Sequence, residues 1–111
     1  MSPAVEREIA VLRKLIGLAG REDVAFYVHF KLEPAEARML GVLYRAKGRA
    51  VSVSRLASGG AHNAVKIHIH RIRRLLEQEA IKHVPERSYA LTPTGVALCD
   101  EALAEAFQEA A

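Results

Sequence analysis

The sequence predicts a mostly helical α+β domain that contains a small β-sheet. Three observations support this fold class. Apolar residues recur at helical spacing in several segments, two short β-forming segments between residues 81 and 92 flank a turn, and Pro, Gly and Ser residues separate these segments. The length of 111 residues suits one domain with a modest core, so we expect residues 1–111 to form a single domain.

Composition excludes several classes of protein. No apolar run is long enough to span a membrane, and no signal peptide precedes the first predicted helix, so we expect a cytoplasmic protein. The single cysteine, Cys99, has no partner for a disulfide within the chain and lies among Ala and Leu residues. We expect it to fill space in the core.

Charge is segregated along the chain. Residues 37–76 contain nine Lys and Arg residues and no Asp or Glu, whereas every charged residue after Arg87 is acidic. A basic centre beside more acidic ends indicates a polyanionic partner that contacts the middle of the chain. The alternative is that these charge blocks only keep the surface solvated.

The first predicted helix covers residues 1–20. Ser2 can cap it ahead of Pro3, and Gly20 ends it. Its apolar residues match a short heptad seam and comprise Val5, Ile9, Leu12, Ile16 and Ala19. We expect another helix to cover this stripe.

After a charged link at residues 21–23, residues 24–32 are predicted to form a β-strand. Their larger apolar residues alternate with smaller or polar ones and comprise Val24, Phe26, Val28, Phe30 and Leu32. This period of two places one face in the core and His29 on the other, where we expect an ordinary surface histidine.

Pro34 begins the next predicted helix, and Gly48 ends it. Glu33 stands at the capping position, where a carboxylate favours the positive end of the helix. The apolar stripe of this helix comprises Ala37, Leu40, Leu43 and Tyr44.

Val51 is predicted to be a strand residue, and Ser52 then caps a brief helix that runs to about Ser58. Leu56 and Ala57 face inward from this helix. Residues 58–61 contain two glycines and are predicted to be the turn of a helix-turn-helix.

Residues 63–79 are predicted to form the second helix of that pair. Val65, Ile69, Ile72 and Leu76 give it one apolar stripe. The opposite face carries Asn63, Lys66, Ile67, His70, Arg71 and Arg74 and no acid. Arg pairs with guanine and Asn with adenine in a DNA major groove, so this face has the chemistry of a DNA reader; a merely solvated surface is the alternative.

Three motifs resemble the DNA-binding domains of the OmpR/PhoB type. Residues 63–77, NAVKIHIHRIRRLLE, are similar to that family's recognition-helix pattern N-x-V-x-V-H-I-x-R-L-R-x-x-L-E. GRAVSVSRL at residues 48–56 resembles G-x-x-V-S-x-x-x-L, and LEPAE at residues 32–36 resembles L-T-x-x-E. The resemblance covers about residues 24–92 and implies a winged helix-turn-helix. Domains of this type usually follow a receiver domain, which we do not find in this sequence, so we expect a stand-alone domain, with the N- and C-terminal helices predicted from apolar spacing at its flanks.

Residues 81–84 and 89–92 are predicted to pair as a hairpin around residues 85–88. In the family that it resembles, this ribbon, residues 81–92, is the wing, which lies at the minor groove or the DNA backbone. Arg87 stands at its tip, where the family often has a contacting arginine. We expect Tyr89 to belong to the core.

The last predicted helix covers residues 93–110 and begins with Thr92 and Pro93. Its stripe comprises Val96, Cys99, Leu103, Ala106 and Phe107. The two terminal helices can pack within one chain or between chains, and we expect a homodimer because small DNA readers commonly match palindromic sites. The candidates for dimerisation are Val5, Ile9, Leu12, Ile16, Leu103 and Phe107.

The resemblance implies a function and a role for individual side chains. It implies a sequence-specific, nucleoid-associated bacterial or phage transcription regulator that binds double-stranded DNA, with residues 63–79 in the major groove. The base or groove contacts are Asn63, which is alternatively a helix cap, Lys66, Ile67, His70, Arg71 and Arg74. The phosphate or wing contacts are Arg49, Arg55, His68, Arg73 and Arg87.

Catalysis, metal binding and cofactors are not expected. His68 and His70 are two residues apart on a helix and face different ways, and no Cys pair or carboxylate cluster completes a ligand set. No Ser-His-Asp constellation is visible, and no phosphate-binding motif surrounds the two glycines at 59–60. The alternative function is a winged helix that contacts a protein, such as RNA polymerase or another regulator.

Overall fold

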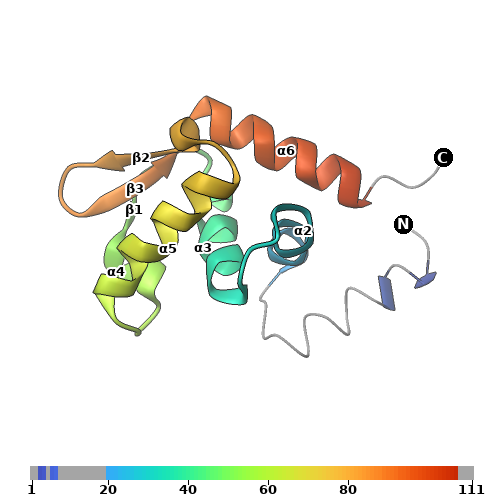
Figure 1. The fold of residues 1–111 in the computed structure, drawn as a ribbon, viewed down its shortest axis with the longest axis horizontal. Helices are drawn as coiled ribbons and strands as arrows, with labels where there is room; N and C mark the ends of the chain where they lie inside the picture. The colour runs from blue at the N-terminus through green and yellow to red at the C-terminus, as the bar shows by residue number, and fades with distance from the viewer. Residues whose placement is uncertain (1–2, 5, 8–19, 108–111) are drawn as a thin grey trace.

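The computed structural model describes residues 3–4, 6–7 and 20–107, which are mostly helical with a small three-stranded antiparallel sheet (Figure 1). The helices are α2 (Arg21–Phe30), α3 (Pro34–Arg45), α4 (Val53–Ala57), α5 (His62–Leu75) and α6 (Pro93–Phe107), with a 3-10 turn η1 (Gln78–Ala80). The strands are β1 (Val51–Ser52), β2 (Ile81–Val84) and β3 (Ser88–Leu91). None of the helices in the described ranges is long and apolar enough to cross a membrane.

Of the first predicted helix, residues 3–4 and 6–7 are described and are helical and exposed, and Gly20 is described as the extended N-cap of α2. The four dimerisation candidates of this segment lie outside the described residues; they are Val5, Ile9, Leu12 and Ile16. Their role stays a prediction.

The predicted strand at residues 24–32 is wrong, because this segment forms helix α2. Val24, Ala25 and Phe26 are buried in succession, whereas Val28 is 58% exposed. A strand with one buried face would alternate between buried and exposed residues, and this segment does not. Lys31 ends the helix in a left-handed conformation, with φ 57°.

The alternation of apolar residues in this segment led to the wrong prediction, because the same residues also fit the spacing of a helix. Phe26 and Phe30 are also four residues apart, which places them on one helical face with ring centroids 6.1 Å apart. Glu22 and Asp23, interpreted above as a link, occupy the first turn of α2, where acids interact favourably with the positive end of the helix. Tertiary packing and this charge pattern together favour the helix.

Helix α3 begins at Pro34 as predicted. Three residues of its predicted stripe, Ala37, Leu40 and Leu43, are each 0% exposed. The backbone N–H of Glu33 donates to Oε1 of Glu36 at 3.0 Å, so a side chain from the first turn closes the start of the helix.

Strand β1 and helix α4 form as predicted around Ser52. The Ser52 hydroxyl oxygen accepts a hydrogen bond of 3.2 Å from the backbone N–H of Arg55. Leu56 of α4 is fully buried. The connection to α5 then passes through Gly59 at φ 85°, a conformation that glycine adopts without steric strain.

The predicted hairpin is confirmed, and β1 adds a third strand to it. Strands β2 and β3 pair antiparallel, with Ile81 opposite Leu91, and β1 pairs with the other edge of β3, with Val51 opposite Tyr89. The sheet order is therefore β1-β3-β2. The backbone N–H of Val53 donates to the carbonyl of Arg87 at 2.9 Å, which anchors the hairpin turn to the start of α4.

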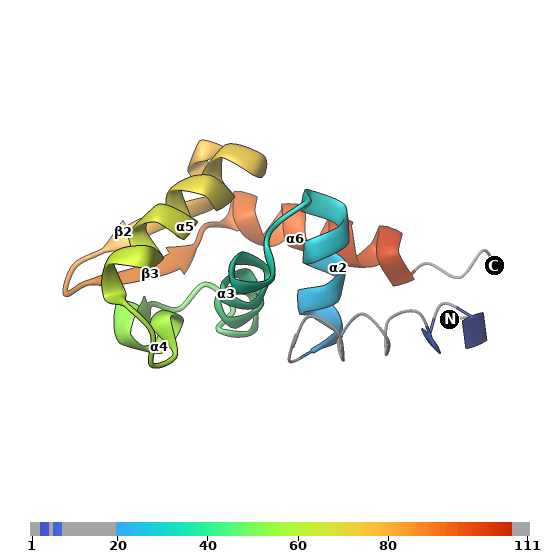
Figure 2. The same ribbon diagram turned by 60° about the horizontal axis from the view of Figure 1, so that its bottom comes forward.

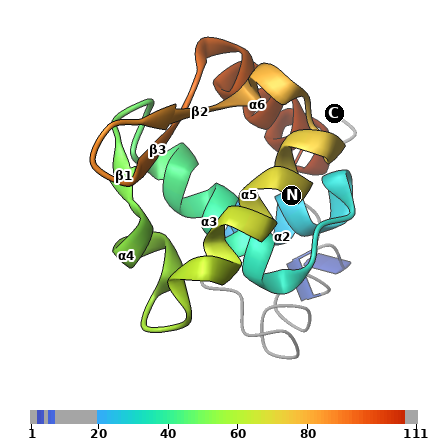
Figure 3. The same ribbon diagram turned by 60° about the vertical axis from the view of Figure 1, so that its left-hand side comes forward.

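The core joins all of these elements into one cluster. Figure 3 shows α3 in the middle, with the hairpin and α4 on one side and α2 and α6 on the other. The large apolar side chains that are fully buried are Phe26, Leu40, Leu43, Leu56, Ile69, Ile72, Ile81 and Leu91. Cys99 is buried among them, as predicted.

Helix α6 begins at Pro93 and packs beside α2 (Figure 2). The guanidinium of Arg21 lies 4.7 Å from the centroid of the Phe107 ring, and Nδ1 of His29 lies 3.6 Å from Oε2 of Glu105. Leu103 and Phe107, both dimerisation candidates, are partly buried against the core of their own chain. The homodimer stays a prediction.

Candidate nucleic-acid interface

Helix α5 has one buried face and one basic face. Val65, Ile69 and Ile72 are at most 1% exposed, in agreement with the predicted stripe. The opposite side, which we call the basic face, is exposed and comprises Asn63, Lys66, Ile67, His70, Arg71 and Arg74. Its donors and positive charge are accessible, and no acidic residue lies on α5.

The limits of α5 differ from those predicted. The helix begins at His62 with Ala61 at the N-cap position, so Asn63 lies inside the first turn and is not a cap. The chain leaves the helical conformation at Leu76, with φ −92° and ψ −82°, instead of continuing to residue 79. Residues 78–80 form η1 instead, because the carbonyl of Ala80 accepts the backbone N–H of Thr92 at 3.0 Å and draws the chain to the base of the sheet.

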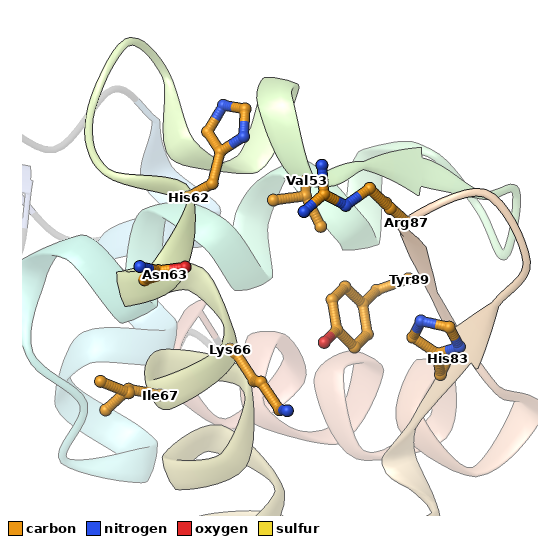
Figure 4. Close-up of a pocket in the computed structure, with 8 residues that line it drawn as sticks. All are labelled: Val53, His62, Asn63, Lys66, Ile67, His83, Arg87 and Tyr89. Atoms are coloured by element: carbon orange, nitrogen blue, oxygen red, sulfur yellow. The ribbon is translucent and has the colours of Figure 1, made fainter.

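An open depression of about 350 Å³ lies between the N-terminal half of α5 and the β2/β3 hairpin (Figure 4). Figure 4 shows Lys66 reaching from α5 towards the hairpin, with Arg87 on the opposite side of the opening. The lining comprises Val53, His62, Asn63, Lys66, Ile67, His83, Arg87 and Tyr89. The fold thus brings predicted contact residues from the helix and from the hairpin tip to one opening.

Tyr89 lies at the base of this depression and is only 8% exposed, in agreement with its predicted place in the core. The ring of His83 meets it edge-on, with centroids 5.4 Å apart. The guanidinium of Arg73 lies 5.9 Å from the same centroid, and its Nε donates to the carbonyl of Ile81 at 2.9 Å. Arg73, predicted as a phosphate contact, therefore also links α5 to the hairpin.

A buried acid from α3 lies behind the basic face. Glu36 is 1% exposed, and its Oε1 accepts a hydrogen bond of 3.0 Å from Nε of Arg71. Its Oε2 lies 3.0 Å from Nδ1 of His68. We call Glu36, His68 and Arg71 the Glu36 cluster. This cluster connects α3 to the middle of α5.

The sequence interpretation missed this role of Glu36, which entered it only as part of the LEPAE motif at residues 32–36. A signal was present, because Glu36 precedes Leu40 by four residues and Leu43 by seven and thus shares their buried stripe. A buried acid needs a hydrogen-bonding or charged partner. The basic helix predicted at residues 63–79 was an available source of one.

Arg49 and Arg55 are exposed and do not line the depression. Arg49 follows α3, and its Nε donates to the carbonyl of Ala46 at 3.2 Å. Arg55 lies on α4, the helix that precedes α5. Neither arginine joins the opening itself.

Charge is separated in space as well as along the chain. The exposed acids Asp100, Glu101 and Glu105 lie on α6, which Figures 1 and 2 show running away from the hairpin towards the other end of the long axis. Near the hairpin end, the exposed acids Glu77 and Glu79 follow α5, and Glu86 precedes Arg87 in the hairpin turn. The basic face itself lies clear of the acids of α6.

Within the described ranges, no three His, Cys, Asp or Glu side chains gather closely enough to hold a metal ion. Comparisons with family models, curated proteins and solved structures give no match to this chain. Function must therefore be inferred from the basic face, the hairpin and the distribution of charge.

Proposed function

We propose that this protein is a winged helix-turn-helix transcription regulator that binds double-stranded DNA. Helix α5 would enter the major groove, and the β2/β3 hairpin would act as the wing at the minor groove or the backbone. The observation that carries this proposal is the basic face of α5, which is exposed beside the hairpin. A major groove about 12 Å wide admits one helix with its side chains.

The order of the elements supports the proposal. Along the chain, helix α3 is followed by the short strand β1. Helices α4 and α5, joined by a tight turn, come next, and the two-stranded ribbon follows them. This is the order expected from the resemblance to OmpR/PhoB-type domains. The motifs that carry the resemblance fall on α3, on β1 with α4, and on α5.

The side chains of the basic face suit different parts of a DNA groove. Arg71 and Arg74 present guanidinium groups that can pair with guanine edges or phosphates. Ile67 is 68% exposed, so its side chain is available to contact a thymine methyl group. Lys66 and Arg87, on opposite sides of the depression, suit the two phosphate backbones that border a groove.

Selection of bound fragments from random double-stranded DNA tests the proposal. We expect enrichment of one sequence, and Arg71→Ala to weaken binding to it by about 1–3 kcal/mol and to relax the preference at one base pair. Arg7→Ala, which removes an exposed base outside α5 and the hairpin, is the control for net charge. Failure to enrich any sequence, or equal losses in both variants, would contradict specific recognition through α5.

We also propose that two copies bind together through the terminal helices. The same selection then yields an inverted repeat whose half-sites lie about 10 base pairs, or a multiple of that, apart. Sedimentation of the free protein gives the oligomeric state independently. A single asymmetric site together with a monomeric mass would argue against the dimer.

A protein partner is the second candidate. The exposed Ile67 and the side chains of Val53 and Tyr89 give the depression an apolar component that a partner's side chain could fill. Salt weakens both kinds of complex, so salt dependence cannot separate them. A sequence-specific footprint favours DNA, whereas a copurifying protein that DNA fails to displace favours the protein partner.

A further inference from the structure

Glu36 is a buried acid whose two oxygen atoms both meet hydrogen-bond donors. Oε1 accepts from the backbone N–H of Glu33 and from Nε of Arg71, each at 3.0 Å, and Oε2 faces Nδ1 of His68 at 3.0 Å. An unpaired carboxylate would be costly at a site that is 1% exposed. These three donors account for its presence there, and two of them come from α5.

The bond to Arg71 controls the orientation of a whole guanidinium group. This group is planar and rigid, so fixing Nε also fixes the plane of the two terminal amino groups. The Arg71 side chain remains 48% exposed, and the structure gives its terminal amino groups no acceptor among the described residues. Arg71 therefore presents a two-pronged donor whose plane is set before any ligand arrives.

The hydrogen bond between Glu36 and His68 determines which ring nitrogen of His68 carries a hydrogen. A carboxylate only accepts hydrogen bonds, so Nδ1 of His68 must carry a hydrogen. In the neutral ring, Nε2 is then an acceptor. His68 can donate to a phosphate through Nε2 only when both ring nitrogens are protonated, which restricts the phosphate role predicted for it.

We infer that Glu36 is a positioning residue for DNA recognition, which sets the guanidinium plane of Arg71 and the tautomer of His68. This inference rests on the proposed function, since it takes DNA as the ligand of the basic face. Its energetic basis is preorganisation, because a side chain that is already ordered loses less conformational freedom when the complex forms.

Glu36→Gln tests the tautomer in the free protein. The glutamine oxygen is expected to face Arg71 and the Glu33 N–H, which both donate, so its NH₂ group faces His68. Nδ1 of His68 must then accept, and the proton of the neutral ring moves to Nε2. Nitrogen NMR of the imidazole, recorded in alkaline solution, should show a protonated Nδ1 in the wild type and a protonated Nε2 in E36Q. Identical tautomers in the two proteins would overturn this part of the inference.

Glu36→Leu tests the orientation of Arg71, because leucine has a similar volume and no acceptor. We expect E36L to lower affinity for the selected DNA sequence about fivefold to tenfold, the loss expected when one long side chain is immobilised only on binding. In an Arg71→Ala background, the same change should have almost no further effect. E36Q keeps the acceptor for Arg71 and should retain most of the affinity.

Asp23→Asn is the matched control, because Asp23 is also a fully buried acid but pairs with Arg45 between α2 and α3. We expect D23N to affect stability without changing DNA affinity. Equal affinity losses from E36L in the wild-type and R71A backgrounds would overturn the positioning role, as would wild-type affinity in E36L. If the wild-type protein selects no DNA, the proposed function fails, while the tautomer measurement still tests the hydrogen bonds of the Glu36 cluster.

Discussion

The phenol of Tyr44 donates a hydrogen bond of 2.6 Å to Oδ1 of Asp100 and thereby joins the end of α3 to α6. This bond, with contributions from burial and from the negative charge of Asp100, raises the pKa of Tyr44 from 10.0 to about 12. The folded protein thus holds the phenolic proton more tightly than the unfolded chain does. The contribution to stability is present below pH 10 and is lost as the pH rises through about 12.

We predict that Tyr44 ionises later than an ordinary tyrosine in an alkaline titration followed by phenolate absorbance. Asp100→Asn should lower the pKa of Tyr44, because an amide removes the charge that opposes the phenolate. Tyr44→Phe should abolish the late phase and identifies the residue. A wild-type titration without any late phase would show that the hydrogen bond is absent in solution.

Arg73 and Arg74 are neighbours with different surroundings. Arg73 is partly buried and donates to the carbonyl of Ile81, whereas Arg74 is exposed. Arg73→Ala should lower the free energy of unfolding by about 1–3 kcal/mol, because it leaves a part-buried carbonyl without its donor. Arg74→Ala should change it by less than about 0.5 kcal/mol. Urea denaturation measures both values, and similar values would mean that Arg73 does not hold the hairpin.

The hairpin turn contains two non-glycine residues in the left-handed region, Glu86 at φ 68° and Arg87 at φ 56°. We predict that Glu86→Gly raises stability by roughly 1 kcal/mol or less, since glycine removes the steric strain but adds flexibility to the unfolded chain. Glu86→Ala removes the same charge but keeps the strain, so it is the control. Equal thermal midpoints for the two variants would indicate that charge, not strain, determines the effect.

Gly95 lies in the first turn of α6, directly above η1. A Cβ atom there would meet the carbonyl oxygen of Ala80 at 2.1 Å and Cδ2 of Leu91 at 2.8 Å. Gly95→Ala should therefore lower the free energy of unfolding by about 1–3 kcal/mol, although alanine favours helices by up to about 1 kcal/mol over glycine. Chemical denaturation checks the sign, and a stabilised variant would mean that α6 stands farther from η1.

Burial raises the pKa of the Cys99 thiol to about 12. Because the thiolate is the reactive form, we expect Cys99 to react slowly with an aromatic disulfide reagent in the native protein and quickly in denaturant. The absorbance of the released thiolate measures both rates. Fast labelling of the native protein would contradict the burial of Cys99 on the inner face of α6.

Most elements could be predicted because their signals are local. Pro34, Ser52 and Thr92 mark where α3, α4 and α6 begin, and the apolar spacing in each segment agrees with a helix. Helix α2 could not be predicted correctly, because its apolar residues satisfy a period of two as well as a spacing of four. Contact with α3 and α6, together with the acids of the first turn, favours the helix.

Part of the candidate site could likewise be predicted from the sequence, and part could not. The exposed side of α5 follows from the spacing of Val65, Ile69 and Ile72 within one helix. The bond between Glu36 and Arg71 joins residues 35 positions apart, so it depends on how α3 and α5 cross. No pattern within either helix specifies that crossing.

The separation of basic side chains on α5 from acidic ones on α6 gives the molecule an electric dipole along its length. In the field of a DNA rod, such a dipole would rotate the protein while it is still diffusing, so that the hairpin end arrives first. Capture would then be fastest at low ionic strength and would slow as added salt shortens the Debye length to about 8 Å under physiological conditions. Neutralising the acids of α6 would weaken this orientation before contact, although the added net positive charge would strengthen the attraction to DNA as a whole.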